Sequence, residues 1–403
     1  MGSTIELPAD SPDLHLSHQP TPEECTQIWS ATAASWKDSL TLPEYLAESQ
    51  YLTTVPLARD GGMNRWVLVN QKLSPGQRQF FCSCESFQKR ALASDERGNV
   101  KESIVQGIAS VFCPPEYRGR GYGTRLMKEL ANVLQRGWPP EDGQKSIGSV
   151  LYSDIGKRYY TRLGWLPNRR NGHFVFPPVK MEKKSALLAH LIPESEVEEL
   201  CLRDEVMVRK AMATPSPSTT QKRVVILPDL DHMLWHIRKE DFATDHIFGK
   251  KAEAKGAIAG SPGKQVWALW VRRYYNHPHH PCEEEGGNVL YILRLVVEGD
   301  STANKPREAQ SPLTSTDAYA GQAAALQAVL QVAQAEAVAW RLDHVHLWEP
   351  SPLVRSLLGQ SDLDATWVER HENNIASALW FMDGGNTVEE DPVWINNEYY
   401  AWC

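Results

Sequence analysis

The chain has 403 residues, more than one ordinary hydrophobic core accommodates, which indicates two domains. Its formal net charge is −8 and no long basic run occurs, so nucleic acid is a poor partner. The seven cysteines are odd in number and scattered, which favours reduced thiols and a cytoplasmic location. The first six residues lack the blocks of a signal peptide, and no apolar run approaches the roughly 20 residues of a membrane span. We therefore expect a soluble intracellular protein.

The first 180 residues are predicted to alternate strands and helices. A short strand is expected at Leu14–His18, and Thr21-Pro22-Glu23-Glu24 forms a capping box that opens a helix ending near Leu40. A second helix start at Thr41 leads to a helix ending near Leu52. The elements expected next are strands at Trp66–Asn70, Gln79–Ser94 and Ser103–Cys113, a helix from Tyr122 to Gln135, a strand at Ser146–Ser153 and a short helix at Ile155–Leu163. This order predicts a mixed α/β sheet.

Residues 181–222 are predicted to form a helical connector that ends in a Pro/Ser/Thr-rich linker at Ala213–Thr220. The second half then repeats the order of strands and helices expected in the first. Its expected elements are a strand at Val224–Leu227, a helix at Leu230–Phe248, strands at Gln265–Tyr275 and Asn288–Val297, a helix at Thr316–Arg341, a strand at His344–Trp348, a short helix at Pro352–Leu358 and a strand at Ala376–Phe381. We interpret residues 223–403 as a degenerate second copy of the fold of residues 1–180, without its glycine loop. An unrelated α+β domain is the alternative.

A glycine-rich turn at Arg118–Gly123 lies between an expected strand and an expected helix. Free backbone N–H groups and the helix dipole make such a junction an anion site, and glycines let the main chain approach a phosphate. The spacing Arg-x-x-Gly-x-Gly differs from the Gly-x-Gly-x-x-Gly of dinucleotide-binding sites and from a P-loop, which ends in Gly-Lys-Ser/Thr. A turn rich in glycine and arginine only for solubility is the alternative.

Arg118-x-x-Gly121-x-Gly123 resembles the pyrophosphate-binding motif of the GNAT superfamily of N-acetyltransferases, at the same strand-to-helix junction. The resemblance implies acetyl-CoA as co-substrate, with its pyrophosphate held by backbone amides from Arg118 to Thr124. It also implies that the strand ending at Cys113 presents a backbone N–H to the thioester carbonyl as an oxyanion-hole donor. The cofactor-binding residues that it implies are Val111, Phe112, Cys113, Arg118, Gly119, Arg120, Gly121, Tyr122, Gly123, Thr124 and Ser153.

The segment Ser153–Trp165 resembles the superfamily's Asn-x-x-Ala-x-x-x-Tyr-x-x-x-Gly-Phe helix. The match implies that Tyr160, four residues before Gly164, protonates the departing thiolate of CoA. A tyrosine that caps the core with its hydroxyl in water is the alternative. Ser153 stands in place of asparagine and Gly156 in place of alanine, so we expect an altered hydrogen bond to the cofactor and a weaker helix.

Further segments narrow the resemblance to the fungal lysine N6-acetyltransferase-like family. They are Ser83–Ser86, Gly107–Phe112, Tyr117–Tyr122, Ser153–Gly156, Trp235–Glu240 and Asn396–Cys403. This family implies transfer to the side-chain amine of free L-lysine. A polyamine or a biosynthetic intermediate stays open as acceptor, because fold and cofactor site do not fix the acceptor. A CoA-binding protein that is inactive and works by interaction also stays open, although the intact loop and Tyr160 argue against it.

The acceptor amine must lose a proton before it attacks, because a free lysine ammonium has a pKa of about 10.4. Glu85, on the strand next to the cofactor strand, is the first candidate for the base or for an ammonium anchor, and a salt-bridged strand carboxylate is the alternative. The second candidate for the base is the chain's own terminal carboxylate at Cys403, by similarity to some bacterial tandem acetyltransferases of comparable length. The aromatic ending of the chain indicates docking, and simple packing of the tail is the competing explanation.

No metal site is expected. The run His277–Cys282 holds three histidines and a cysteine. Zinc needs ligands from at least two places in the sequence, however, and no second Cys/His pair is present to complete a site. His232 and His236 share a helix face and are predicted to form a stripe at the domain interface. The second half is expected to bind no CoA and to form a wall of the cleft for the acceptor, a small-molecule amine.

Overall fold

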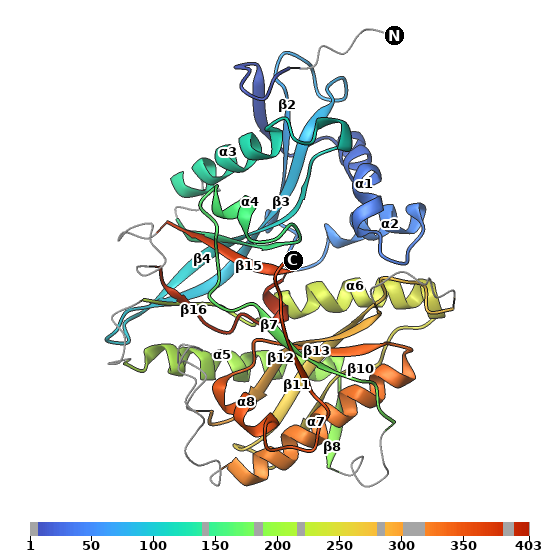
Figure 1. The fold of residues 1–403 in the computed structure, drawn as a ribbon, viewed down its shortest axis with the longest axis vertical. Helices are drawn as coiled ribbons and strands as arrows, with labels where there is room; N and C mark the ends of the chain where they lie inside the picture. Colours follow the sequence, from blue (N-terminus) through green and yellow to red (C-terminus); the bar gives the residue numbers. More distant parts are fainter. Residues whose placement is uncertain are drawn as a thin grey trace.

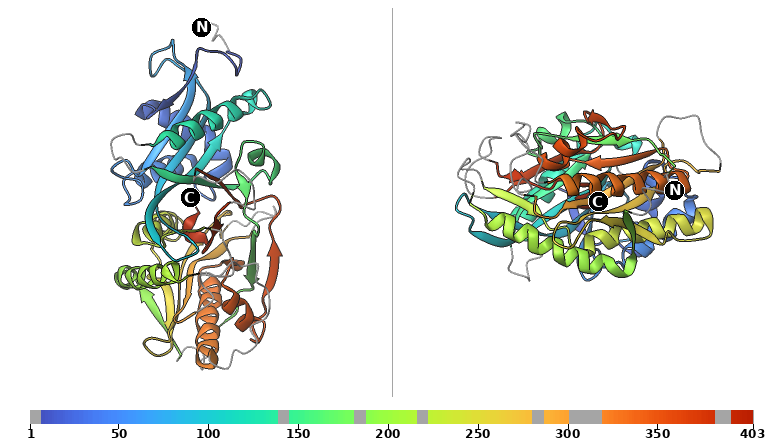
Figure 2. Two further views of the ribbon diagram at one scale, coloured as in Figure 1. Left: turned by 90° about the vertical axis from the view of Figure 1, so that its left-hand side faces the viewer. Right: turned by 90° about the horizontal axis from the view of Figure 1, so that it is seen from below.

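The structure, a computed structural model, describes residues 7–138, 145–180, 188–215, 222–279, 287–300, 319–381 and 391–402. They form two β-sheets, one above the other in Figure 1, with helices packed against each. The C-terminus lies between the upper and lower parts, as the side view in Figure 2 also shows. No helix of the described residues is both long enough and apolar enough to span a membrane.

The first sheet is built mainly from the first half of the chain. In spatial order its strands are β1 (Leu14–His18), β2 (Met63–Asn70), β3 (Phe80–Ser94), β4 (Val100–Phe112), β5 (Ser146–Ser153), β15 (Ile375–Trp380) and β6 (Leu166–Pro167), and β9 (Arg223–Ile226) and β16 (Val393–Trp394) extend it beside β3. Helix α3 (Tyr122–Arg136) connects the parallel strands β4 and β5, while α1 (Pro22–Trp36) and α2 (Leu42–Leu52) connect β1 to β2. The capping box expected at Thr21 is present, with both of its hydrogen bonds formed.

The second sheet is built mainly from the second half. In spatial order its strands are β8 (Ala189–Pro193), β10 (Ala254–Ala259), β11 (Val266–Arg273), β12 (Val289–Val297), β13 (His344–Trp348), β7 (Gly172–Phe176) and β14 (Thr366–Glu369). Helix α7 (Ala320–Ala339) connects the parallel strands β12 and β13 and is followed by α8 (Pro352–Leu358) after β13. Helices α5 (Val197–Ala213) and α6 (Leu230–Phe248) lie between this sheet and the upper part of the molecule (Figure 1).

The two sheets share one strand order. Strands β1 to β5 of the first correspond to β8, β10, β11, β12 and β13 of the second, and each sheet then has one inserted strand and a short last strand, β6 or β14. Each sheet contains one parallel pair joined by a crossover helix, β4-α3-β5 and β12-α7-β13. This architecture confirms the expected fold class, a mixed α/β GNAT fold followed by a degenerate second copy.

The inserted strand of each sheet comes from the other half of the chain. Strand β15 pairs antiparallel with β5 and β6 of the first sheet, and β7 pairs antiparallel with β13 and β14 of the second. Strand β7 therefore lies within the range 1–180 that the sequence assigned to the first domain, yet it completes the second sheet. The first half thus gives β7 to the second sheet, and the second half gives β15, together with β9 and β16, to the first sheet.

One hydrophobic core joins the two sheets. It includes Ala91 and Val150 of the first sheet, Trp267 and Leu269 of the second, and Ile237 of α6, all of them buried. The intervening residues of β11 face the opposite way, into a core formed with α7, as the two-residue period of a strand requires. Both faces of the second sheet are therefore covered.

Some expectations differ from the structure. The helix expected at Ile155–Leu163 is limited to α4 (Arg158–Thr161), because Gly156 adopts a φ of +73° and Ser153 closes a turn by donating to its carbonyl. The connector 181–222, expected to be helical, contributes the strand β8 before α5. Residues 216–221 of the linker, the end of the His277–Cys282 run, and Cys403 lie outside the described residues.

Candidate active site

The glycine-rich turn predicted from the sequence opens helix α3. Gly119 and Gly121 have φ angles of +75° and +92°, and Gly121 is the N-cap of the helix. The first N–H groups of a helix have no partner within it, so the amides of Tyr122, Gly123 and Thr124 form an anion site at the helix N-terminus. The turn therefore has the left-handed backbone conformation that its glycines led us to expect.

Gly123 brings the two sequence motifs into contact. A Cβ on Gly123 would lie 2.8 Å from the hydroxyl oxygen of Tyr159, which real Cβ contacts essentially never show. The absence of a side chain therefore lets α4 pack against the loop. The ring of Tyr159 packs edge-on against that of Tyr160, with 5.0 Å between the ring centroids.

The side chains of the loop serve the fold. Tyr122 is buried and donates its hydroxyl to the carbonyl of Leu7 at 2.6 Å. Arg118 donates from Nε to the carbonyl of Cys113 at 3.0 Å, and its guanidinium lies over the ring of Phe112. Tyr122 therefore offers a ligand its backbone amide, and Arg118 fastens the loop to the end of β4.

Strand β4 leaves its neighbour β5 near this loop. Their pairing ends at Ile108 and Leu151, whereas β4 continues to Phe112. On the other side the register with β3 shifts between Ala109 and Phe112, and Ser110 takes a φ of +53°. This bulge places the backbone of Val111, Phe112 and Cys113 beyond the ladder with β5, where an extended acyl chain can insert.

Tyr160 sits on α4 at the edge of the opening between β4 and β5. Its side chain is buried, lines a cavity, and its hydroxyl makes no hydrogen bond to any described residue. Burial raises the pKa of Tyr160, with smaller contributions from the nearby Tyr159 and Cys82. The phenol therefore stays protonated at neutral pH, as a proton donor must. Ser153, by contrast, holds its hydroxyl within its own turn, donating to the Gly156 carbonyl at 2.8 Å.

A cavity of about 240 Å³ lies next to Tyr160 and the β4 bulge. Helices α1 and α2 and strands β2, β3 and β4 form its first wall, and α6, β11 and the end of the chain form its second. Both halves of the chain thus enclose it, as expected for the second half. Its charged side chains include three carboxylates and three cations, namely Glu48, Glu85, Asp154, Arg65, Lys239 and Arg273. Of these six, sequence reasoning had selected only Glu85.

Glu85 lines the cavity beside the bulge. Ser110 donates its hydroxyl to Glu85 Oε2 at 2.9 Å, so the strained residue of β4 holds the carboxylate directly. Burial raises the pKa of Glu85, although the Ser110 hydrogen bond and the charge of Arg65 oppose the shift. A carboxylate with a raised pKa is a better base than an ordinary glutamate.

Two of the three cations are neutralised by partners within the fold. Lys239 on α6 pairs with Glu48 on α2 at 2.7 Å. Arg273 on β11 pairs with Asp38 through two hydrogen bonds of 2.9 and 3.2 Å, and lies over the ring of Trp402. These pairs cross between the halves of the chain and hold α2 against the second sheet.

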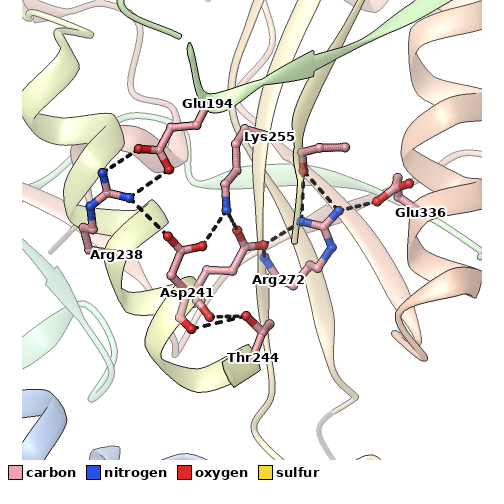
Figure 3. Close-up of polar contacts among 9 residues, drawn as sticks. Glu194, Arg238, Asp241, Thr244, Lys255, Arg272 and Glu336 are labelled. Atoms are coloured by element: carbon pink, nitrogen blue, oxygen red, sulfur yellow. Dashed lines mark hydrogen bonds and ion pairs between the residues drawn. The ribbon is translucent and has the colours of Figure 1, made fainter. Parts of the chain in front are cut away.

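Helix α6 is fixed to the second sheet by a buried network of ion pairs, drawn in Figure 3. Lys255 bridges Glu240 and Asp241 at 3.0 and 2.6 Å, and Arg272 pairs with Glu240 at 2.7 Å and also with Glu336 on α7. Removing one member of such a network leaves a buried charge uncompensated, which makes its geometry hard to change. The network therefore sets the face that α6 presents to the cavity.

The end of the chain is anchored in the second sheet. Glu398 accepts from Arg294 at 2.6 Å and from the backbone N–H of Leu295 at 3.0 Å, just past the point where β12 and β13 part. Tyr399 stacks on Tyr291 at 3.9 Å, and Trp402 lines the cavity. Cys403 itself, a candidate for the base, lies outside the described residues.

His232 and His236, the two histidines predicted to form a stripe at the domain interface, lie on α6 and face the last residues of the chain. His236 Nε2 lies 3.2 Å from the carbonyl of Tyr400, and His232 pairs with Asp229 at 2.7 Å. Both rings are buried, and burial lowers the pKa of His236 to about 3. They are neutral at physiological pH and serve packing between α6 and the end of the chain.

Comparison with known proteins finds a matching family model and several similar proteins. The family model described as the LYC1 GNAT-like C-terminal domain matches residues 173–403, more than half of the chain. A lysine acetyltransferase of Yarrowia lipolytica is 24% identical over 290 residues, which are 63% of this chain and 71% of that protein. Among solved structures, a probable N-acyltransferase of Enterococcus faecalis is 11% identical, with a TM-score of 0.48, covering 91% of this chain and 71% of its own. A GCN5-related N-acetyltransferase of Kribbella flavida is 14% identical, with a TM-score of 0.47, covering 92% and 72%.

The repeated fold, the loop at α3 and the family match define an N-acetyltransferase of the GNAT type, for which acetyl-CoA is the acyl donor. The chain belongs to the family of the LYC1 GNAT-like C-terminal domain.

Proposed function

We propose that the protein transfers the acetyl group of acetyl-CoA to the side-chain amine of free L-lysine, by direct attack in a ternary complex. The observation that carries the proposal is the cavity beside the β4 bulge, which brings Glu85 and Tyr160 together and holds charges of both signs. A small zwitterion with a second amine complements such a lining. The name of the Yarrowia lipolytica relative, a lysine acetyltransferase, supports the same acceptor.

In the proposed mechanism, the amides of the α3 loop hold the pyrophosphate, and the acyl chain extends between β4 and β5. The ammonium of the acceptor loses its proton to Glu85, and the amine nitrogen attacks the thioester carbonyl carbon. A backbone N–H at Val111 to Cys113 stabilises the oxyanion of the tetrahedral intermediate. When the C–S bond breaks, Tyr160 donates its proton to the departing sulfur. The attacking nitrogen, which still carries one proton more than the amide product, releases that proton to solvent, and the phenolate of Tyr160 regains a proton from solvent.

A second candidate for the base is the terminal carboxylate of Cys403. The side chain before it, Trp402, lines the cavity, which supports an approach of the chain end to the acceptor. A Glu85→Gln variant separates the two candidates, because it leaves the terminal carboxylate in place.

The first test is acetyl-CoA turnover, followed as thiol release, against lysine, ornithine, polyamines and a lysine peptide. We expect turnover of free lysine, and a fall in kcat of about 10²- to 10⁴-fold in Tyr160→Phe. Tyr274→Phe is the matched control, since Tyr274, directly after β11, is a buried phenol that donates to the Trp340 carbonyl at 2.9 Å. It is expected to keep kcat.

The outcomes separate the alternatives. If the enzyme turns over a polyamine or the peptide better than lysine, that amine is the acceptor, and the mechanism stands. Tight CoA binding without thiol release for any amine would support a binding role instead. Unchanged kcat in Tyr160→Phe would remove the phenol from the mechanism.

A further inference from the structure

Arg65 stands apart from the other cations of the cavity. It lies on β2, directly opposite Glu85 in the register with β3. Its Nη1 donates to Cys25 Sγ at 3.0 Å, and its guanidinium lies over the ring of Trp29 at 5.7 Å. Both partners belong to α1 and neither carries a negative charge. Within the described residues, no carboxylate oxygen comes within 4.0 Å of Arg65, whereas Lys239 and Arg273 each have one.

Burying half of a guanidinium without a direct ion pair costs free energy, because the charged group loses hydration that no carboxylate replaces. Thiol and aromatic partners return little of the hydration that Arg65 gives up on burial. The planar fork of arginine matches a carboxylate, to which it can donate two parallel hydrogen bonds. Since Arg65 lines the cavity, an incoming carboxylate can complete the pairing that the fold leaves open.

The position of Arg65 fits an amine that is remote from its carboxylate. Strands in a sheet lie about 4.8 Å apart, so β2 is roughly 10 Å from the bulge of β4, with Glu85 on β3 between them. In an extended lysine five bonds separate the side-chain nitrogen from the α carbon, a span of about 6 Å. With the side-chain amine at the bulge, the methylene chain crosses β3 and the carboxylate reaches Arg65. An α-amine lies too close to its own carboxylate to bridge this distance.

We propose that Arg65 binds the α-carboxylate of the acceptor, so that the site selects an amino acid acetylated on its distal amine and rejects amines without a carboxylate. This inference rests on the proposed function, which it deepens by naming the residue that recognises the acceptor. The role is in binding, distinct from the proton transfers assigned to Glu85 and Tyr160.

The test compares lysine with cadaverine, which is lysine without its carboxylate, in the full-length enzyme with acetyl-CoA. The wild-type enzyme should prefer lysine in kcat/KM. Arg65→Gln should lower kcat/KM for lysine by about 10- to 100-fold, mainly through KM, because a hydrogen-bonded charge pair is lost. Its kcat/KM for cadaverine should fall less than that for lysine, by only the effect of losing the Arg65 charge beside Glu85, and its KM for acetyl-CoA should stay within about two-fold of wild type. Arg65→Lys should recover part of the preference, since it keeps the charge but lacks the fork.

Arg59→Gln is the matched control, because Arg59 is a solvent-exposed arginine whose ion pair among the described residues is with the still more exposed Asp60. Arg59→Gln should change kcat/KM for neither lysine nor cadaverine. Equal losses for lysine and cadaverine in Arg65→Gln would show a structural role and overturn the inference, as would an unchanged preference for lysine. Lack of lysine turnover by the wild-type enzyme would overturn the proposed function first, and the inference with it.

Discussion

Glu85 and Tyr160 show how burial can prepare two ionisable side chains for opposite tasks. Burial disfavours the charged form of each and so raises both pKa values. For the phenol this preserves the proton that the leaving thiolate needs. For the carboxyl it strengthens the base, provided that the solution is alkaline enough to ionise it. The same environment thus supplies an acid and a base because the two groups start from very different pKa values.

The raised pKa of Glu85 predicts a pH dependence of the reaction. The group accepts a proton only when ionised, so kcat/KM should fall as pH decreases through its pKa in the folded enzyme. That midpoint should lie above the value of about 4.3 for an ordinary glutamate. In Glu85→Gln we expect this acidic limb to vanish and kcat/KM to fall by about 10²-fold or more. The measurement is the pH profile of kcat/KM for lysine in both enzymes.

Glu102→Gln provides the control, since Glu102 is an exposed carboxylate of β4 paired with Arg209. Its profile should match that of the wild-type enzyme. An acidic limb that survives in Glu85→Gln would assign it to another group and strengthen the terminal carboxylate as the base.

For individual residues of the site, the sequence predicted those that belong to motifs. It missed those that come together only when the chain folds. The glycines of the loop and Tyr160 have fixed spacings that a sequence displays. Arg65 belongs to no motif, and Lys239 lies in the family-like segment Trp235–Glu240, to which the sequence attached no role. The two are 174 positions apart, but both line the cavity. A charged residue looks the same in a sequence whether it faces solvent or a substrate.

Among the elements, the turn before α3 offers a test of what its glycines do. Gly121 has a φ of +92°, and an alanine there should lose about 1–2 kcal/mol because left-handed backbone is unfavourable for residues with a Cβ. The N-terminal amides of α3 should also shift, so the KM for acetyl-CoA should rise by about ten-fold in Gly121→Ala. Steady-state kinetics and urea unfolding measure the two effects.

Gly249→Ala separates stability from cofactor binding. Gly249 ends α6 with a φ of +66°, and nothing lies within 4 Å of an added Cβ. The Gly249→Ala variant should lose as much stability as Gly121→Ala but keep the wild-type KM for acetyl-CoA. An equal rise in KM in both variants would mean that Gly121 acts through general destabilisation.

The sequence predicted best those elements that carry their own boundaries. Helix α6 begins after the cap Asp229 and ends at Gly249, and its expected range agrees with the structure. Strand β10, which reads Ala-Lys-Gly-Ala-Ile-Ala, was missed because alanine and glycine carry little strand preference. Its formation depends on pairing with β8 and β11, which a local pattern cannot show.

For the whole molecule, the exchange of β7 and β15 has a consequence for folding. Each sheet is complete only when the other half supplies its sixth strand, and the buried core between the sheets draws residues from both. The repeat of the fold was visible in the order of expected elements, whereas the exchange was not, because strand patterns do not specify partners. The active-site cavity, enclosed by both halves, exists only when both are folded.

The exchange predicts that the chain unfolds as one cooperative unit. Heating should give a single calorimetric transition, because neither sheet can retain its strands once the other has unfolded. Acetyl-CoA at about 100 times its Kd should stabilise the folded chain by about 2.7 kcal/mol and move the whole transition. Hydrogen exchange of a peptide from β12, in the second sheet, should slow to the same extent as one from β3. Gly121→Ala should reduce this shift at a fixed acetyl-CoA concentration. Two separate transitions, or protection confined to the first sheet, would show that the halves fold independently despite their exchanged strands.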